Sequence, residues 1–132
     1  MSDDWTMVHL EDVPDVLGDY PGEMRFLTGP LGATQVAITH RRMPAQTGGK
    51  GGYGHRHRAQ EEIYLVTQGT LQAKLDGTVI DIPAGSAVRV APRVVRSLWN
   101  EGPGDAHVVL VSTWSADPRE DAEMVPDFWP AG

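Results

Sequence analysis

Three side chains that can bind a metal ion lie close together in the segment GHRHRAQEEIYLVTQG, residues 54–69. His55 and His57 are separated by a single residue, so on a β-strand both imidazoles point to the same face. Residues 58–61 can reverse the chain, and Glu62 is then expected to open the adjacent antiparallel strand beside the two histidines. Two imidazoles and a carboxylate that converge in this way form a facial triad for Fe, Mn, Ni or Zn. A histidine pair alone is also typical of a polar surface hairpin, but the added Glu62 and the flanking strands favour a pocket.

The elements that must position these side chains are predicted to be short β-strands. Runs of Val, Ile, Leu and Thr alternate with Gly, Pro and Asn, and helical periodicity is almost absent. We predict strands at residues 62–67, 70–75, 78–82, 86–91, 94–99 and 106–113. Asp76-Gly77 is the strongest hairpin signal, because both residues tolerate positive φ. Regularly spaced strands of this kind indicate an all-β sandwich or barrel.

The pattern is less regular toward the two ends of the chain. Residues 32–44 indicate a strand that ends at Pro44, and residues 45–54 indicate a flexible loop. Residues 24–29 indicate another strand, which in one interpretation pairs with another subunit. We therefore expect three parts, an N-terminal arm at 1–33, a β-barrel at 34–115 and an acidic, Pro-rich tail at 116–132 packed on the barrel through Phe128 and Trp129.

Two motifs in this sequence resemble those of the cupin superfamily. The first, G(x)5HxH(x)4E(x)6G, is matched by Gly49, His55, His57, Glu62 and Gly69, and the start of the second, G(x)5PxG, by Gly77, Pro83 and Gly85. The resemblance spans residues 34–113 and implies a single cupin-type antiparallel β-barrel, a jelly-roll-like double sheet with its site inside, often in a homodimer. It selects Glu62 over the adjacent Glu61 and places Tyr64 on the same inward face. Cupins include dioxygenases, isomerases, decarboxylases, storage proteins and sensor domains, so the resemblance leaves the function open.

The sequence departs from the family pattern at Arg96. Cupins that bind metal through four side chains usually place a histidine four residues before an asparagine, and here Arg96 precedes Asn100 at that offset. Alternation directs Arg96 and Leu98 into the barrel, yet a guanidinium has no lone pair for a metal. Three alternatives remain open. Arg96 pairs with Glu62 in a metal-free pocket, binds the carboxylate or phosphate of a ligand, or turns outward into a surface salt bridge.

Composition excludes several classes of function. The 132 residues suit one domain, and 40% of them are hydrophobic, which is typical of a globular protein. The absence of cysteine excludes disulfides, thiolate ligands and a cysteine nucleophile. A formal net charge of −7 argues against binding to nucleic acid or to anionic membranes. The chain shows neither a signal peptide nor an apolar run long enough to span a bilayer, so we expect a cytoplasmic protein with no membrane partner.

Other candidate residues carry weaker signals. His40 and His107 could each supply a displaced metal ligand, although a buried or exposed histidine without that role is more common. The GGKGG run at residues 48–52 lacks the order of a phosphate-binding loop and is expected to form a mobile rim of the pocket.

Two functions from different classes follow from these observations. The first is a small-molecule-binding cupin acting as a metal-dependent enzyme, oxygenase- or isomerase-like, on a small anionic substrate. Its site would hold a divalent transition metal (Fe, Mn, Ni or Zn) and no organic cofactor, with substrate contacts from Arg96, Tyr64 and Leu98. The alternative is a metal-free, non-catalytic ligand-binding or assembly cupin in which Arg96 pairs with Glu62. Catalysis itself stays open at this point.

Overall fold

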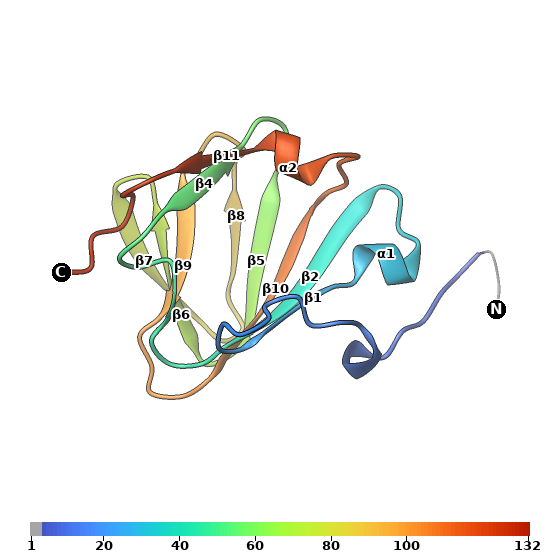
Figure 1. Ribbon diagram of the computed structural model, residues 1–132, viewed down its shortest axis with the longest axis horizontal. Coiled ribbons are helices and arrows are strands. Elements are labelled where there is room, and N and C mark those ends of the chain that lie inside the picture. The colour runs from blue at the N-terminus through green and yellow to red at the C-terminus, as the bar shows by residue number, and fades with distance from the viewer. Residues whose placement is uncertain (1–3) are drawn as a thin grey trace.

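Two antiparallel β-sheets face each other in the computed structural model, which describes residues 4–132 (Figure 1). The first sheet has the strand order β1 (Glu23–Phe26), β2 (Val36–Met43), β10 (Ala106–Thr113), β5 (Glu62–Gln68), β8 (Ala87–Val90). The second has the order β11 (Ala122–Val125), β4 (Gly54–His57), β9 (Arg96–Asn100), β6 (Thr70–Leu75), β7 (Thr78–Pro83), with β3 (Thr47–Gly48) beside β9. The helical segments are short: η1 (Leu10–Asp12), α1 (Thr28–Leu31) and α2 (Pro118–Asp121). The predicted all-β class and jelly-roll-like double sheet are confirmed.

The strands predicted after Glu62 are present as β5 to β10. The largest shift is at β9, which begins at Arg96 instead of Val94, because Val94 still belongs to a turn in which its N–H donates to the carbonyl of Ala91. The predicted hairpin joins β6 to β7, and Asp76 adopts a positive φ of 51° there. Apolar spacing and turn chemistry therefore predict these elements well.

The connection at residues 58–61 differs from its prediction. Strand β4 lies in the second sheet, where it pairs with β9 and β11, whereas β5 lies in the first sheet between β10 and β8. The expectation that Glu62 opens a strand hydrogen-bonded to the histidine strand is therefore wrong. In this jelly roll the chain crosses from one sheet to the other at this corner. The histidines and Glu62 consequently face each other across the interior of the sandwich.

Strand β1 belongs to the first sheet of its own chain. It pairs antiparallel with β2, so that Met24 lies opposite Arg41. Its outer edge is partly covered by the preceding segment, since the N–H of Val16 donates to the carbonyl of Met24 at 2.9 Å and Asp15 accepts from the N–H of Met24 at 3.0 Å. Within its own chain this strand therefore pairs with β2, and a pairing of the N-terminal arm with another subunit stays a prediction. The homodimer itself stays a prediction.

The core fills one end of the sandwich and leaves the other end open. Strand β10 shows this division, because Ala106 and Val108 are fully buried in the core whereas Leu110 and Ser112 line a cavity. The tail covers part of the second sheet, where β11 adds to the edge of β4 and Trp129 is buried.

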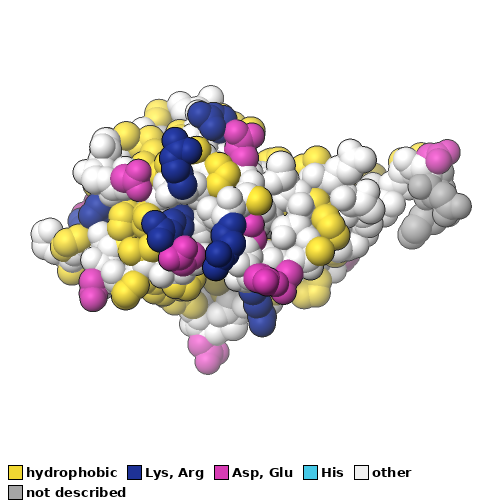
Figure 2. Space-filling view, turned by 90° about the horizontal axis from the view of Figure 1, so that it is seen from above, with side chains coloured by type: hydrophobic (Ala, Val, Ile, Leu, Met, Phe, Trp, Pro, Cys, Tyr) yellow, Lys and Arg dark blue, Asp and Glu magenta, His cyan; other side chains and the backbone are white. Residues whose placement is uncertain are grey.

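The outside of the molecule carries charges of both signs. Figure 2 shows Lys and Arg side chains beside Asp and Glu side chains on the face seen from above, and Arg56 of β4 pairs with Glu123 of β11 at 2.8 Å. Residues 4–9, which precede η1, extend away from the sandwich (Figure 1). Trp5 in this segment is exposed. Within residues 4–132, no helix is both long and apolar enough to cross a membrane.

Candidate functional site

A cavity of about 940 Å³ lies between the two sheets, at the end that the core leaves open. Much of its wall is apolar and aromatic, with contributions from Met24, Phe26, Leu98, Leu110 and Trp114. A volume of this size accommodates a small organic molecule. The residues predicted to contact metal or substrate all line it: His55, His57, Glu62, Tyr64, Arg96 and Leu98.

His55, His57 and Glu62 converge in this cavity. Their ligand atoms lie within 4.8 Å of one another. Glu62 Oε1 is 3.4 Å from Nε2 of His57 and 3.8 Å from Nε2 of His55. Strand alternation explains the shared direction of the imidazoles, because the intervening Arg56 points outward to Glu123. Within the described chain, this is the group of His, Asp and Glu side chains that could hold a metal ion.

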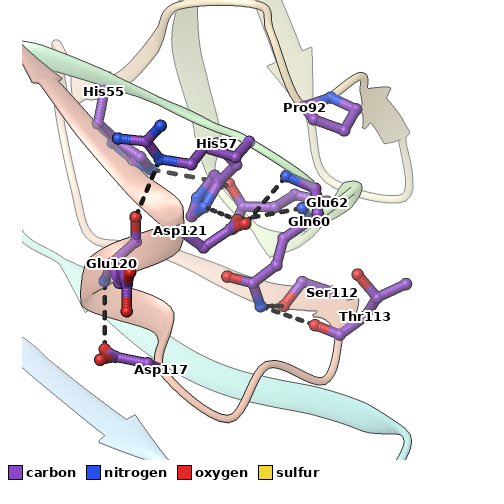
Figure 3. Close-up of polar contacts among 12 residues, drawn as sticks. His55, His57, Gln60, Glu62, Pro92, Ser112, Thr113, Asp117, Glu120 and Asp121 are labelled. Carbon is purple, nitrogen blue, oxygen red and sulfur yellow. Dashed lines mark hydrogen bonds and ion pairs between the residues drawn. The ribbon is translucent and has the colours of Figure 1, made fainter.

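Asp121 contacts the imidazole nitrogen of His57 that points away from Glu62. The sequence analysis did not identify this residue. Its Oδ2 lies 3.0 Å from Nδ1 of His57, and its carboxylate also accepts hydrogen bonds from the backbone N–H groups of Ala59 and Gln60 (Figure 3). Burial alone would raise the pKa of Asp121, but these hydrogen bonds outweigh it and hold the pKa below its usual value. No local signal could have identified this residue, since it lies in the tail, far from His57 in sequence.

Glu62 lies at the centre of the polar contacts in the cavity. Oε1 lies near both imidazoles and accepts a hydrogen bond from the Tyr64 hydroxyl at 3.3 Å. Burial would raise the pKa of Glu62, yet the histidines and the positive charge of Arg96 hold it well below its usual range. Burial also raises the pKa of Tyr64, so this hydroxyl stays protonated and donates to the carboxylate. Glu62 is therefore an ionised acceptor at neutral pH.

Arg96 lies inside the sandwich with no exposed side-chain surface. Its two terminal nitrogens donate to the carbonyls of Pro92 and Ala91, both at 3.2 Å. Its Nε lies 3.5 Å from Oε1 of Glu62, an ion-pair distance without hydrogen-bond geometry. The alternative in which Arg96 turns outward is wrong. The backbone carbonyls occupy one N–H of each terminal nitrogen, which reduces the number of donors left for a ligand anion.

His40 and His107 lie away from the cavity. They contact each other, with Nδ1 of His107 3.4 Å from Nε2 of His40, and neither lines the cavity. Neither therefore supplies a displaced ligand in this arrangement. The glycine-rich run does border the cavity, since Gly48, Lys50 and Gly52 are part of its wall.

The donor set at His55, His57 and Glu62 fits a divalent transition metal. Both nitrogens of His57 face carboxylate oxygens, and a neutral imidazole has only one N–H to donate. When that N–H donates to Asp121, the lone pair of Nε2 faces an oxygen of Glu62 that also bears lone pairs. A cation between Nε2 and the Glu62 oxygen would be coordinated by both atoms and would remove the repulsion between their lone pairs. A carboxylate that accepts from the other nitrogen of a metal-binding histidine is a common arrangement.

Comparisons with known proteins agree with this fold. Residues 42–112, more than half of the chain, match the family model described as a cupin domain, whereas no curated protein matches. A cupin protein from Bacteroides fragilis is 21% identical, with a TM-score of 0.67 and 89% of each chain covered. A sugar phosphate isomerase of the cupin superfamily from Silicibacter pomeroyi is 15% identical, with a TM-score of 0.74 and coverage of 92% of this chain and 93% of that chain.

A third solved structure extends the range of activities found on this fold. The polyketide cyclase from Streptomyces resistomycificus is 20% identical, with a TM-score of 0.67, and the match covers 87% of this chain and 90% of that chain. At these identities the similarity concerns the fold alone, and the activities belong to those proteins. Together with the matched family model, the double sheet and the two motifs lead to one conclusion about identity. The chain belongs to the cupin family.

Proposed function

We propose that this cupin binds a divalent transition metal through His55, His57 and Glu62 and acts on a small molecule held beside it in the cavity. One observation carries the proposal. The Nε2 atoms of both histidines lie within 3.8 Å of the same carboxylate oxygen, while Asp121 fixes the opposite nitrogen of His57. When bound, such a metal supplies a Lewis acid that polarises an oxygen of the substrate.

The surrounding residues prepare the site for this role. Arg96 compensates the charge of Glu62 and favours the carboxylate form, which is the form that coordinates a cation. Tyr64 orients the same carboxylate through its hydroxyl, and Leu98 contributes an apolar wall. The fold neighbours include a sugar phosphate isomerase and a polyketide cyclase, and we infer a reaction of the isomerase or oxygenase kind on a small anionic substrate.

Metal analysis of freshly purified protein tests the proposal. We expect about one Fe, Mn, Ni or Zn ion per chain, and a melting temperature that falls when a chelator removes it. The His57→Ala variant should lose the metal, whereas the matched His107→Ala variant, whose imidazole lies outside the cavity, should keep it. Protein that carries no metal and takes up none on reconstitution would contradict the proposal.

A second candidate function rests on Arg96. A fully buried guanidinium stands where many cupins have a fourth histidine, and it already neutralises Glu62 without any metal. In this case the cavity binds a small ligand without catalysis, or the sandwich serves in a homodimer. The same experiment separates the candidates, because chelators then leave the melting temperature unchanged. Light scattering determines whether the homodimer forms.

A further inference from the structure

Arg41 is a partly buried cation of the cavity wall that forms no ion pair with any residue from 4 to 132. It lies on β2, between Met24 of β1 and Val108 of β10, and its side chain is part of the cavity wall. Its Nε is buried and has no hydrogen-bond partner among the described residues. Burial lowers the pKa of Arg41, and the groups that oppose this effect are three tyrosines rather than a carboxylate.

The neighbouring arginine shows the contrast. Arg42 points to the opposite face of β2, where it forms ion pairs at 3.2 Å with both Glu23 and Asp105. The two residues are adjacent in sequence, and strand alternation alone separates them. Arg42 is therefore a charge-compensated cation on the outer face of β2, whereas Arg41 faces the cavity without an ion pair among the described residues.

The remaining charges of the cavity wall are already balanced. Arg96 lies beside Glu62, and Lys50 lies 3.8 Å from Glu101. Burying a guanidinium without a counter-charge is costly, so a protein keeps one inside where something pairs with it. The excess charge in this cavity is therefore positive at Arg41, and a bound metal would increase that excess.

We propose that Arg41 is the residue that recognises a carboxylate of the substrate. The inference rests on the proposed function, since it requires that the cavity take a small molecule, and it specifies the chemistry of that molecule. Among residues 4–132 no second cation of the cavity wall lacks an ion pair, and a single guanidinium matches a singly charged carboxylate better than a phosphate dianion. The apolar body of the substrate would lie along Phe26 and Leu110, with its reacting end toward His55, His57 and Glu62. Arg41 thus takes the role that the sequence suggested for Arg96.

Binding of three aromatic probes to the purified protein tests this assignment. Phenylacetate, phenylacetamide and phenyl phosphate share an apolar ring and differ in charge, and NMR titration gives a Kd for each. We expect the wild-type protein to bind phenylacetate about tenfold or more tightly than the neutral amide, and more tightly than the phosphate. Arg41→Met should remove this preference, whereas the matched Arg42→Met, which also deletes one positive charge, should retain it.

Each outcome decides for or against the proposal. A wild-type protein that binds the carboxylate no better than the amide overturns it, as does an Arg41→Met variant that keeps the preference. Tighter binding of phenyl phosphate overturns the choice of a carboxylate. If Arg41→Met does not fold, Arg41→Lys serves instead and should retain only part of the preference. Metal content is measured on the same samples, so that a missing metal with an intact carboxylate preference contradicts the proposed function and not this inference.

Discussion

Nδ1 of His57 lies 3.0 Å from Oδ2 of Asp121, and this contact connects the C-terminal tail to the cavity. Asp121 ends α2 and directly precedes β11, which pairs with β4, the strand that carries both histidines. The same carboxylate binds the N–H groups of Ala59 and Gln60, at the corner between the sheets. The tail therefore holds the imidazole of His57, a proposed metal ligand, in addition to covering a sheet edge.

Asp121→Asn is expected to weaken metal binding by about 10- to 100-fold, the effect typical of losing the carboxylate behind a ligating histidine. The side-chain amide of this variant can accept a hydrogen bond from one backbone N–H through its oxygen. Its NH₂ group then faces the other backbone N–H, and two donors cannot bond to each other. Competition with a metal-sensitive dye measures the affinity. The exposed neighbour Glu120 provides the control, because Glu120→Gln removes no contact to His57 and should leave the affinity unchanged.

Arg96→Met is expected to destabilise the fold by about 3–5 kcal/mol, because it leaves the buried carboxylate of Glu62 without its cation. Two backbone carbonyls also lose their donors in this variant. The pKa of Glu62 should rise as well, since the positive charge of Arg96 lowers it.

A double-mutant cycle with Glu62→Gln separates the ion pair from the other losses. The double variant should be more stable than the sum of the two single effects predicts, because each single variant leaves one unpaired buried charge. Urea unfolding supplies the free energies. Strictly additive effects would show that Arg96 and Glu62 do not interact.

The sequence predicted the strands of this protein better than it predicted their partners. Period-two alternation correctly placed His55 and His57 on one face and Arg96 and Leu98 in the interior. The convergence of Glu62 with the histidines was expected for the wrong reason, since β4 and β5 lie in different sheets. Local patterns predict which face a side chain takes, but the sheet that a strand joins depends on contacts between residues far apart in the chain.

Local sequence patterns could not identify two residues of the cavity region. Asp121 belongs to an acidic tail in which several carboxylates look equivalent, and only the pairing of β11 with β4 selects it. Arg41 and Arg42 form an unremarkable basic pair in sequence. Their different roles follow from the ion pairs of Arg42 with Glu23 and Asp105, which the sequence does not reveal.

Trp129→Ala is expected to cost about 3–5 kcal/mol, since this side chain is only 6% exposed. The backbone of Trp129 also pairs with Gly51 and Gly52 at the cavity wall, so looser tail packing should weaken metal binding in addition. Trp5→Ala is the matched control, because Trp5 is 67% exposed and its loss should change stability little. Thermal unfolding of both variants compares them, and equal melting temperatures would contradict a structural role for the tail.

The contact between His40 and His107 predicts how stability depends on pH. Burial and the neighbouring His107 lower the pKa of His40 from its ordinary 6.5, so the unfolded chain binds a proton more readily than the folded one. The resulting stabilisation is complete above the unfolded pKa and is lost as the pH falls below about 6.5 toward the folded value.

The melting temperature of the wild-type protein should therefore fall between about pH 7 and pH 5, and it should fall less steeply in His40→Gln, which has no imidazole to protonate. His107→Gln should flatten the profile only in part, because it removes the second cause of the shift and leaves the burial of His40 in place. The wild-type protein and the two variants differ only at the substituted histidine. A difference between their slopes of melting temperature against pH therefore reports that residue and not the other histidines. Identical slopes in the wild-type protein and His40→Gln would show that His40 does not contribute to the acid sensitivity.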